Sequence, residues 1–339
     1  MFLLAIAGIG LTVAAIGCTA GSGTLRGTGD GRVSEFPIVT EPLTQTLAVV
    51  SGSTVVWHDD RDDTVWMRDL TSEDEPIPLV DWSPMDMADG FVVGIGSVKG
   101  VLAFHIYGYN LTQQKSFSIA DRVPVTLGLA TCNEHLGAYP FPLPSTSGGI
   151  VVWPVHVDDD FGYGRDVIFM YDLTANEGPE ILVRADHVQG KLAISHDFVV
   201  WEDCGDIVGY HLGSQEHIKI SSHPGKEQAP DVANNVVVWQ DDRNGNWDIY
   251  GYDLQTNTEF QITTDDSDQQ FPAVSDHFVV WEDKRNGNTD IFGYNLATRT
   301  VFPIAIDPSE QTGVEISGNI VVWVDTRNGN GDIYGADLK

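Results

Sequence analysis

The sequence predicts an all-β fold: a seven-bladed β-propeller of four-stranded antiparallel blades, closed by an N-terminal strand. Three observations predict it. Trp239, Trp281 and Trp323 recur at intervals of 42 residues, each at the end of a Val-Val-Trp run. Each run is followed by an Asn-Gly turn and an Asp-Ile-Tyr or Asp-Ile-Phe strand. Residues 36–46 also repeat the pattern of residues 302–312, which indicates that the two ends of the chain share one blade.

Four weaker copies of the repeat lie upstream, which brings the number of modules to seven. Their central strands contain Trp57, Val93, Trp153 and Trp201. Runs of Val, Ile, Trp and Tyr alternate with Gly, Asn and Asp, as in short strands joined by turns. Asn-Gly pairs favour two-residue hairpins because a type I′ turn needs positive φ twice. A further strand before and after each hairpin gives every module four strands.

The last module stops at Lys339 without its fourth strand, and residues 36–46 supply the missing strand. A ring closed in this way leaves no sheet edge unpaired and ties the two ends of the chain together. We therefore divide the chain into an export signal (residues 1–20), a flexible linker (21–33) and the propeller (34–339).

The N-terminal segment has the features of an export signal. Residues 1–17 carry no charged side chain and are almost entirely apolar or glycine, a stretch too short to span a membrane comfortably. The sequence Ala15-Ile16-Gly17-Cys18 resembles the lipobox of bacterial lipoproteins, which predicts a lipid on Cys18 and a protein tethered in the cell envelope or periplasm. Cleavage after Ala20 and an uncleaved anchor are the alternatives.

The charge of the chain excludes two classes of partner. Its 339 residues include 18 Lys and Arg against 49 Asp and Glu, a net charge of -31. Such a field repels nucleic acid and anionic lipid surfaces. We expect no nucleic-acid partner, and contact with a membrane only through the N-terminal lipid or signal.

The stretch Asp-x-Arg-Asn-Gly-Asn-x-Asp-Ile-Tyr, which begins at Asp241 in the fifth module, resembles the WD40-like repeat of TolB-type propellers. The resemblance is close in the last three modules and covers the chain from about Phe36 to Lys339. It implies an exported propeller at the cell surface or in the periplasm that serves interaction more often than catalysis.

Paired aspartates face each other across the hairpins of the last three modules. Counting outward from Asn244-Gly245 places Asp241 opposite Asp248, and two facing carboxylates repel each other unless a positive charge lies between them. Calcium would satisfy such a pair. The interpretation we favour uses no metal: Arg243 bridges the acids with its planar guanidinium. This structural network comprises Asp241, Arg243, Asp248, Asp283, Arg285, Asp290, Asp325, Arg327 and Asp332.

Modules three and four depart most from the repeat, and their loops are where a function would be added. A recognition surface, a His/Asp metal or catalytic site, and ordinary acidic loops without a function are the three interpretations. Module three has an insertion at about 122–140 and a long middle hairpin, whereas module four has a short one. The topology brings these loops to one face. The side chains of this candidate binding surface are Glu134, His135, His156, Asp158, Asp159, Asp160, His187 and Asp203.

Two cysteines remain besides Cys18. Cys132 lies in the loop that enters module three and Cys204 in the middle hairpin of module four, so both lie over neighbouring blades on one face. An exported chain favours a disulfide between them, worth about 2–4 kcal/mol. Two unpaired thiols are the alternative.

These observations lead us to expect a non-catalytic exported scaffold that binds a protein or a polysaccharide and needs no cofactor. The alternative is a propeller enzyme, a glycan lyase or hydrolase, with its site above modules three and four. The central funnel distinguishes the two, because propeller enzymes converge acids, bases and often a metal there. No nucleophile elbow, phosphate loop or dinucleotide fingerprint occurs in the sequence.

Overall fold

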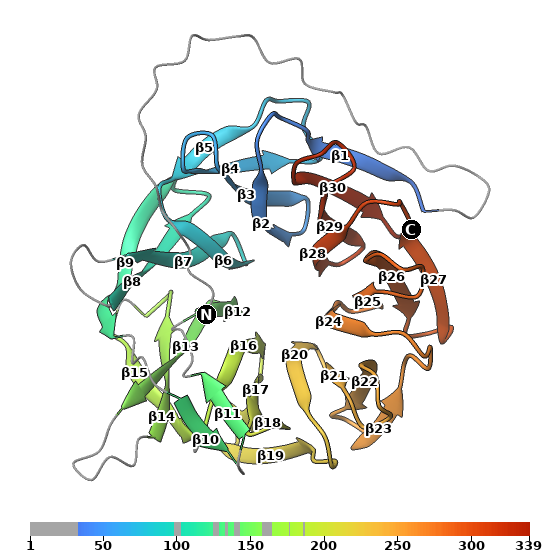
Figure 1. Cartoon of the computed structure of the whole chain (residues 1–339). Helices are drawn as coiled ribbons and strands as arrows, with labels where there is room; N and C mark the ends of the chain where they lie inside the picture. The colour runs from blue at the N-terminus through green and yellow to red at the C-terminus, as the bar shows by residue number, and fades with distance from the viewer. Residues whose placement is uncertain are drawn as a thin grey trace.

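The computed structural model describes residues 33–97, 103–124, 129–132, 135–138, 143–157, 165–175, 177–185 and 187–339. Their secondary structure consists of strands, arranged as seven four-stranded antiparallel sheets and one two-stranded hairpin. The seven sheets form a ring around a central opening (Figure 1). The predicted seven-bladed propeller is confirmed. In the described part of the chain, no helix has the length and apolarity needed to cross a membrane.

Each blade has one strand at the centre of the ring and three further out (Figure 1). The inner strands of blades 1 to 7 are β2 (Gln45–Ser51), β6 (Ser83–Ala88), β12 (Ser145–Ser147), β16 (Gln189–Ser195), β20 (Glu227–Ala233), β24 (Gln269–Val274) and β28 (Gln311–Ser317). The second strands are β3 (Thr54–Asp59), β7 (Phe91–Ser97), β13 (Ile150–Val157), β17 (Phe198–Asp203), β21 (Val236–Asp241), β25 (Phe278–Asp283) and β29 (Ile320–Asp325).

The outer half of each blade is a second pair of strands. The third strands are β4 (Thr64–Asp69), β8 (Ala103–Asn110), β14 (Arg165–Asp172), β18 (Asp206–His211), β22 (Asp248–Asp253), β26 (Asp290–Asn295) and β30 (Asp332–Asp337). The outermost strands are β5 (Ile77–Val80), β9 (Lys115–Pro124), β15 (Glu180–Ala185), β19 (Glu216–Ser221), β23 (Thr258–Gln261), β27 (Thr300–Ala305) and β1 (Glu35–Val39). The additional hairpin pairs β10 (Leu129–Cys132) with β11 (His135–Ala138).

The core consists of layers between neighbouring blades. The Val-Val-Trp runs of the second strands supply most of it, and six of their tryptophans are fully buried: Trp57, Trp153, Trp201, Trp239, Trp281 and Trp323. Each faces a partner across the second hairpin, as Trp239 does Tyr250, with ring centroids 6.2 Å apart. Burial of this much aromatic surface is the main driving force for packing one blade on the next.

Blade 2 fills the same layer with a tryptophan from another position. Gly94 stands where the other blades have the second-strand tryptophan, opposite Tyr107. The ring of Trp82, from the turn before β6, occupies the space, because a Cβ on Gly94 would lie 2.4 Å from Trp82 Cζ3. Trp82 stacks on Tyr107 at 5.8 Å. The aromatic pair is therefore kept although its sequence position moves.

Strand β1 closes the ring by pairing with β30 in blade 7. Phe36, Ile38 and Val39 are buried, and Glu35 forms an ion pair with Arg327 at 2.7 Å. The outermost strand of the last blade thus comes from the N-terminal end of the propeller, as predicted.

In the arginine network, the hydrogen-bond donors of the two facing aspartates differ from those predicted. In blade 6, Asp283 lies opposite Asp290, as expected. Arg285 donates to both oxygens of Asp283 at 2.8 and 2.6 Å but does not bridge the pair. Asp290 instead accepts from the amides of Asn286 and Asn288. The Asn residues of the turn therefore supply the hydrogen bonds to the second carboxylate, which the sequence interpretation had assigned to the arginine.

The same arrangement recurs in the neighbouring blades. Arg243 and Arg327 bind Asp241 and Asp325, while Asn244 and Asn328 bind Asp248 and Asp332. Each guanidinium also lies 4.0 to 4.3 Å from the centroid of the aromatic ring that follows on the third strand. Blade 1 has an equivalent pair in Arg61 and Asp59, which the sequence analysis did not identify.

Deleting residues 33–39 removes β1 and should abolish cooperative folding. The deletion removes three buried apolar side chains whose burial is worth together about 5–9 kcal/mol, comparable with the whole stability of a typical domain. Thermal unfolding followed by circular dichroism tests it, with deletion of residues 21–30 as the control that leaves β1 intact. A melt that matches the control would show that β1 does not close the ring.

Replacing Arg285 by Met should lower the free energy of unfolding by about 1–3 kcal/mol, because Asp283 is 0% exposed and would lose its charge-assisted hydrogen bonds. Met retains contact with Phe292, so the loss reports the charge. Lys284→Met in the same turn is the control and should cost less than about 1 kcal/mol. If a chelator lowered the melting temperature of the unmutated protein and calcium restored it, calcium and not arginine would hold these acids.

Candidate functional site: the central cavity

A cavity of about 1780 Å³ occupies the centre of the ring. Residues of all seven inner strands line it, and it extends sideways between blades 4 and 5, where Glu202, Cys204, His223 and Lys226 reach it. The inner strands converge on this space in Figure 1. A side chain that points inward from any blade therefore meets side chains from the other blades.

Three carboxyl groups enter the cavity from equivalent positions of different blades. Asp86, Asp231 and Glu315 each pair with the second valine of the Val-Val run on the neighbouring strand. The remaining four blades have small or apolar residues at this register position: Val49, Ser145, Ala193 and Ala273. The three acids therefore lie at one level of the channel, although up to 229 positions separate them in the sequence.

Lys191 of β16 is the cation of this cluster. Burial acts to lower the pKa of its ammonium group, but the negative charges of Asp86, Glu315 and Asp231 outweigh burial and raise the pKa above its ordinary value. Lys191 therefore remains protonated. One ammonium and three carboxyl groups from blades 2, 4, 5 and 7 form a connected electrostatic unit, which we call the inner cluster.

The three carboxyl groups are held differently. The N–H of Thr146 donates to Asp86 Oδ2 at 2.9 Å, and that of Val274 to Asp231 Oδ2 at 2.7 Å. Each aspartate thus links its inner strand to that of the next blade. Among the described residues, no backbone N–H donates to Glu315. Burial, helped by the charges of Asp231 and Asp86, raises its pKa to about 7, although Lys191 acts to lower it.

A second carboxyl group with a near-neutral pKa lies in the sideways extension. Burial raises the pKa of Glu202 to about 7, opposed by a hydrogen bond from Gln228 and the charge of Lys226. That bond is long, at 3.5 Å. Its counterpart in blade 6, Glu282, accepts a 2.7 Å bond from the N–H of Gly313. Glu202 and Glu315 are therefore two carboxyl groups in one cavity that can exchange protons near neutral pH.

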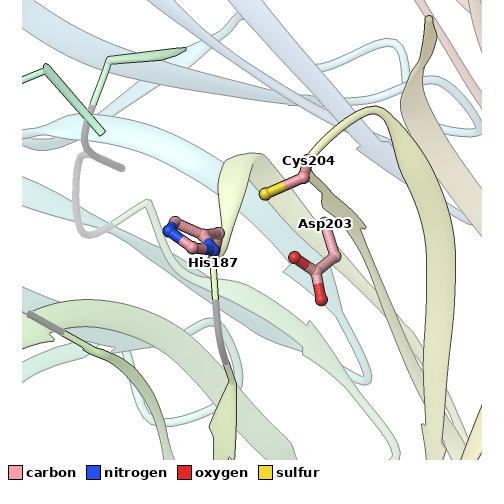
Figure 2. A group of neighbouring side chains, drawn as sticks. All are labelled: His187, Asp203 and Cys204. Carbon is pink, nitrogen blue, oxygen red and sulfur yellow. The ribbon is translucent and has the colours of Figure 1, made fainter. Parts of the chain in front are cut away.

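At the rim of blades 3 and 4, His187, Asp203 and Cys204 come together, as Figure 2 shows. One nitrogen of His187, one carboxylate oxygen of Asp203 and the sulfur of Cys204 all lie within 4.8 Å of one another. Cys204 is disulfide-bonded. Its predicted partner, Cys132, is at the end of β10, and its side chain lies outside the described residues, so the pairing stays a prediction.

The candidate binding surface is only partly assembled. His187 and Asp203 do lie together, as expected for loops on one face. His156 does not belong to a surface: it is 8% exposed, and its Nδ1 lies 2.6 Å from Asp166 Oδ1 inside blade 3. Glu134, Asp158, Asp159, Asp160, Cys18 and the side chain of His135 lie outside the described residues.

The inner cluster was missed by the sequence analysis, although the sequence contains a signal for it. Aligning the seven inner strands on the register position above places Asp86, Asp231 and Glu315 against four uncharged residues. The Val-Val-Trp runs and the turns repeat regularly and are easy to align. The inner strands vary from blade to blade, so their shared register position is hard to recognise in the sequence.

Comparison with solved structures finds the same fold in enzymes. An oligogalacturonate lyase from Vibrio parahaemolyticus matches with a TM-score of 0.61 and 10% identity over 92% of this chain and 95% of the lyase. An oligogalacturonate lyase in complex with manganese matches at 0.57 and 11% over 85% and 86%. Pyrococcus horikoshii acylaminoacyl peptidase matches with a TM-score of 0.64 and 11% identity. The match covers 88% of this chain but only about half (52%) of the peptidase.

No protein-family model matches the chain, and no curated protein matches it in sequence. The structural matches confirm the propeller and do not single out TolB-type proteins. They correct the expectation of a non-catalytic scaffold, because the similar structures are lyases and peptidases. The inner cluster lies in the central funnel, the place where the sequence analysis expects a propeller enzyme to gather acids and bases.

Glu315→Gln should remove a pH dependence of stability. The pKa of Glu315 is about 7 in the folded protein, above its ordinary 4.5. Between these values the native state binds more protons than the unfolded state, so the free energy of unfolding falls as the pH rises and levels off above about 7. At about pH 8 the variant should be more stable by about 1–3 kcal/mol.

Urea unfolding from about pH 5 to about pH 8 measures this slope. Asp276→Asn is the control, because Asp276 lines the cavity but is exposed to solvent. Equal slopes in the Glu315→Gln variant and the unmutated protein would contradict a titrating carboxyl group in the inner cluster.

Proposed function

We propose that the protein is an enzyme that acts on glycans, and that it cleaves uronate-containing chains by β-elimination in the central cavity. The observation that carries this proposal is the inner cluster, in which Glu315, with a pKa of about 7, shares a half-buried site with the cation Lys191. A near-neutral base beside a fixed positive charge is what the reaction requires.

β-Elimination removes a proton from the carbon next to the uronate carboxylate and expels the glycosidic oxygen from the adjacent carbon. The carboxylate of Glu315 accepts this proton. Because its pKa lies near neutrality, an appreciable fraction is ionised at pH 7 and the conjugate acid gives the proton up again. Lys191, whose raised pKa keeps it charged, neutralises the negative charge that develops on the substrate carboxylate.

The extent of the matches favours a lyase over a peptidase. The two oligogalacturonate lyases are covered over 95% and 86% of their own length, so the propeller accounts for nearly the whole of each. The peptidase is covered over about half, so most of its remaining half has no counterpart in this match. A function carried by the propeller alone corresponds to the lyases.

A divalent metal is compatible with the same cluster. One of the lyases is in complex with manganese, and the carboxyl groups of Asp86 and Asp231 are oxygen donors of the kind that Mn²⁺ takes in proteins. These two residues would hold the ion beside Glu315, and the ion would supply further positive charge to neutralise a substrate carboxylate. The acidic channel would otherwise repel an anionic glycan.

The sequence supports a location for this activity. An apolar segment at residues 1–17 followed by Cys18 favours export and a lipid tether, and polysaccharides are substrates of the cell envelope and its surroundings. We propose that the enzyme works outside the cytoplasm on glycans that reach the cell surface or periplasm.

A screen of uronate-containing and neutral oligosaccharides, with and without Mn²⁺, tests the proposal. Elimination creates a carbon–carbon double bond conjugated to the carboxylate, and its ultraviolet absorbance appears together with new chain ends. Glu315→Gln and Lys191→Met should each lower kcat by about 100-fold or more. Asp197→Asn, at an exposed position outside the cavity, should retain full activity.

Two outcomes would overturn the proposal. New reducing ends without ultraviolet absorbance would show hydrolysis in place of elimination. Full activity of a folded Glu315→Gln variant would remove the inner cluster from the reaction.

A further inference from the structure

The middle hairpin of blade 4 has lost the arginine that its relatives use. Asp203 follows Trp201 by two positions, as Asp241 follows Trp239, and it faces Asp206 as Asp241 faces Asp248. Where blade 5 has Arg243, blade 4 has Gly205. Cys204 and Gly205 have φ of 53° and 86°, so they form the whole of a tight two-residue turn.

The carboxylate of Asp203 has other neighbours than its counterparts in blades 5 to 7. In blades 5 to 7 the indole N–H of the tryptophan donates to this aspartate, as Trp281 does to Asp283 at 2.8 Å. In blade 4 the buried Nε1 of Trp201 has no hydrogen-bond partner. The carboxylate of Asp203 lies near His187 and Cys204 instead (Figure 2).

The segment that carries His187 is anchored from the neighbouring blade. The N–H of Val188 donates to Asp166 Oδ2 at 2.5 Å, and Val188 is buried in the layer between blades 3 and 4. Asp166 is itself paired with His156. The imidazole of His187 is thus presented to the blade 4 hairpin by a backbone fixed one residue away.

The three side chains form a donor set for zinc. Zn²⁺ binds imidazole nitrogen, carboxylate oxygen and thiolate sulfur, and catalytic sites combine three protein ligands with water. Its bond lengths place ligand atoms of a tetrahedral site about 3.3–3.8 Å apart. The atoms of His187, Asp203 and Cys204 lie within 4.8 Å of one another, so a movement of about 1 Å would bring them to bonding distance.

The disulfide of Cys204 competes with zinc for the same sulfur. The thiolate is the metal ligand, and a sulfur in a disulfide has no negative charge to offer. We propose that His187, Asp203 and Cys204 are a zinc site that is closed while Cys204 is disulfide-bonded and opens when the disulfide is reduced. The site is separate from the inner cluster and does not depend on the proposed lyase activity.

The chemistry of opening balances with a dithiol as reductant. The dithiol gives two electrons and two protons to the disulfide, leaves two cysteine thiols on the protein, and becomes a cyclic disulfide itself. The thiol of Cys204 then releases one proton as its sulfur binds Zn²⁺. A small-molecule disulfide reverses the exchange: it accepts two electrons and two protons from the two cysteines, is itself reduced to thiols, and the metal loses its sulfur ligand. Because Cys204 also lines the central cavity, the redox state decides whether a metal ion lies at its edge.

Zinc titration of the tag-free protein before and after treatment with a dithiol tests the proposal. The reduced protein should bind one Zn²⁺ per chain at least about 100-fold more tightly than the oxidised protein. Co²⁺ in place of zinc should give the near-ultraviolet sulfur-to-metal absorption band in the reduced protein only. Circular dichroism shows whether the reduced chain stays folded.

Variants separate this site from chance binding. His187→Ala and Cys204→Ser should each weaken zinc binding of the reduced protein by about 10- to 100-fold. His211→Ala, in the same blade but at the other end of β18, should leave it unchanged. In the predicted disulfide, Cys132→Ser leaves the thiol of Cys204 free without any reductant. This variant should therefore bind zinc under oxidising conditions, in the absence of dithiol.

Three results would overturn the proposal: equal affinity of the oxidised and reduced proteins, no zinc binding by either the reduced protein or the folded Cys132→Ser variant, or zinc binding that persists in Cys204→Ser. None of these measurements uses a glycan, so a failure here is distinct from a failure of the lyase proposal.

Discussion

Closure of the ring is the constraint on which the rest of the structure depends. Each blade buries the Val-Val run of its second strand against the next, and the last layer can form only because β1 completes blade 7. Once the ring is closed, the inner strands must converge on one axis. Convergence brings Asp86 and Glu315 into the same small volume, although neither is near the other in the sequence. The packing of the tryptophans therefore sets the geometry of a site that they do not touch.

A cluster of half-buried carboxyl groups is costly, which is why the inner cluster argues for function. Burial raises the pKa of Glu315 and of Asp231, so both groups destabilise the folded protein when they are ionised. Blades 1 and 6 show that an apolar residue, Val49 or Ala273, serves the same register position. The fold does not need acids there. Groups that cost stability and have pKa values near neutrality are concentrated at sites of proton transfer.

The regular parts of the molecule could be predicted from the sequence because their signals repeat. The facing of Asp241 and Asp248 followed from the Asn-Gly turn alone, and the closing strand from its likeness to β27. Details that depend on side-chain packing could not be predicted. The asparagine amides, not the arginine, donate hydrogen bonds to Asp290. In blade 2, Trp82 fills the space of the missing second-strand tryptophan. In both cases the tertiary neighbours, and not the local sequence spacing, determine which side chain occupies the position.

Both candidate sites lie where one blade departs from its relatives, and the physical reason is the same in each. A repeat satisfies its polar groups with its own residues, as Arg285 does for Asp283, and such groups are not available to a ligand. Glu315 has no backbone donor of the kind that holds Asp86 among the described residues, and Asp203 has no arginine in its hairpin. In this chain the polar groups of the repeat are arranged differently at the channel axis and at the tight turn of blade 4, and these are the two places where we propose chemistry.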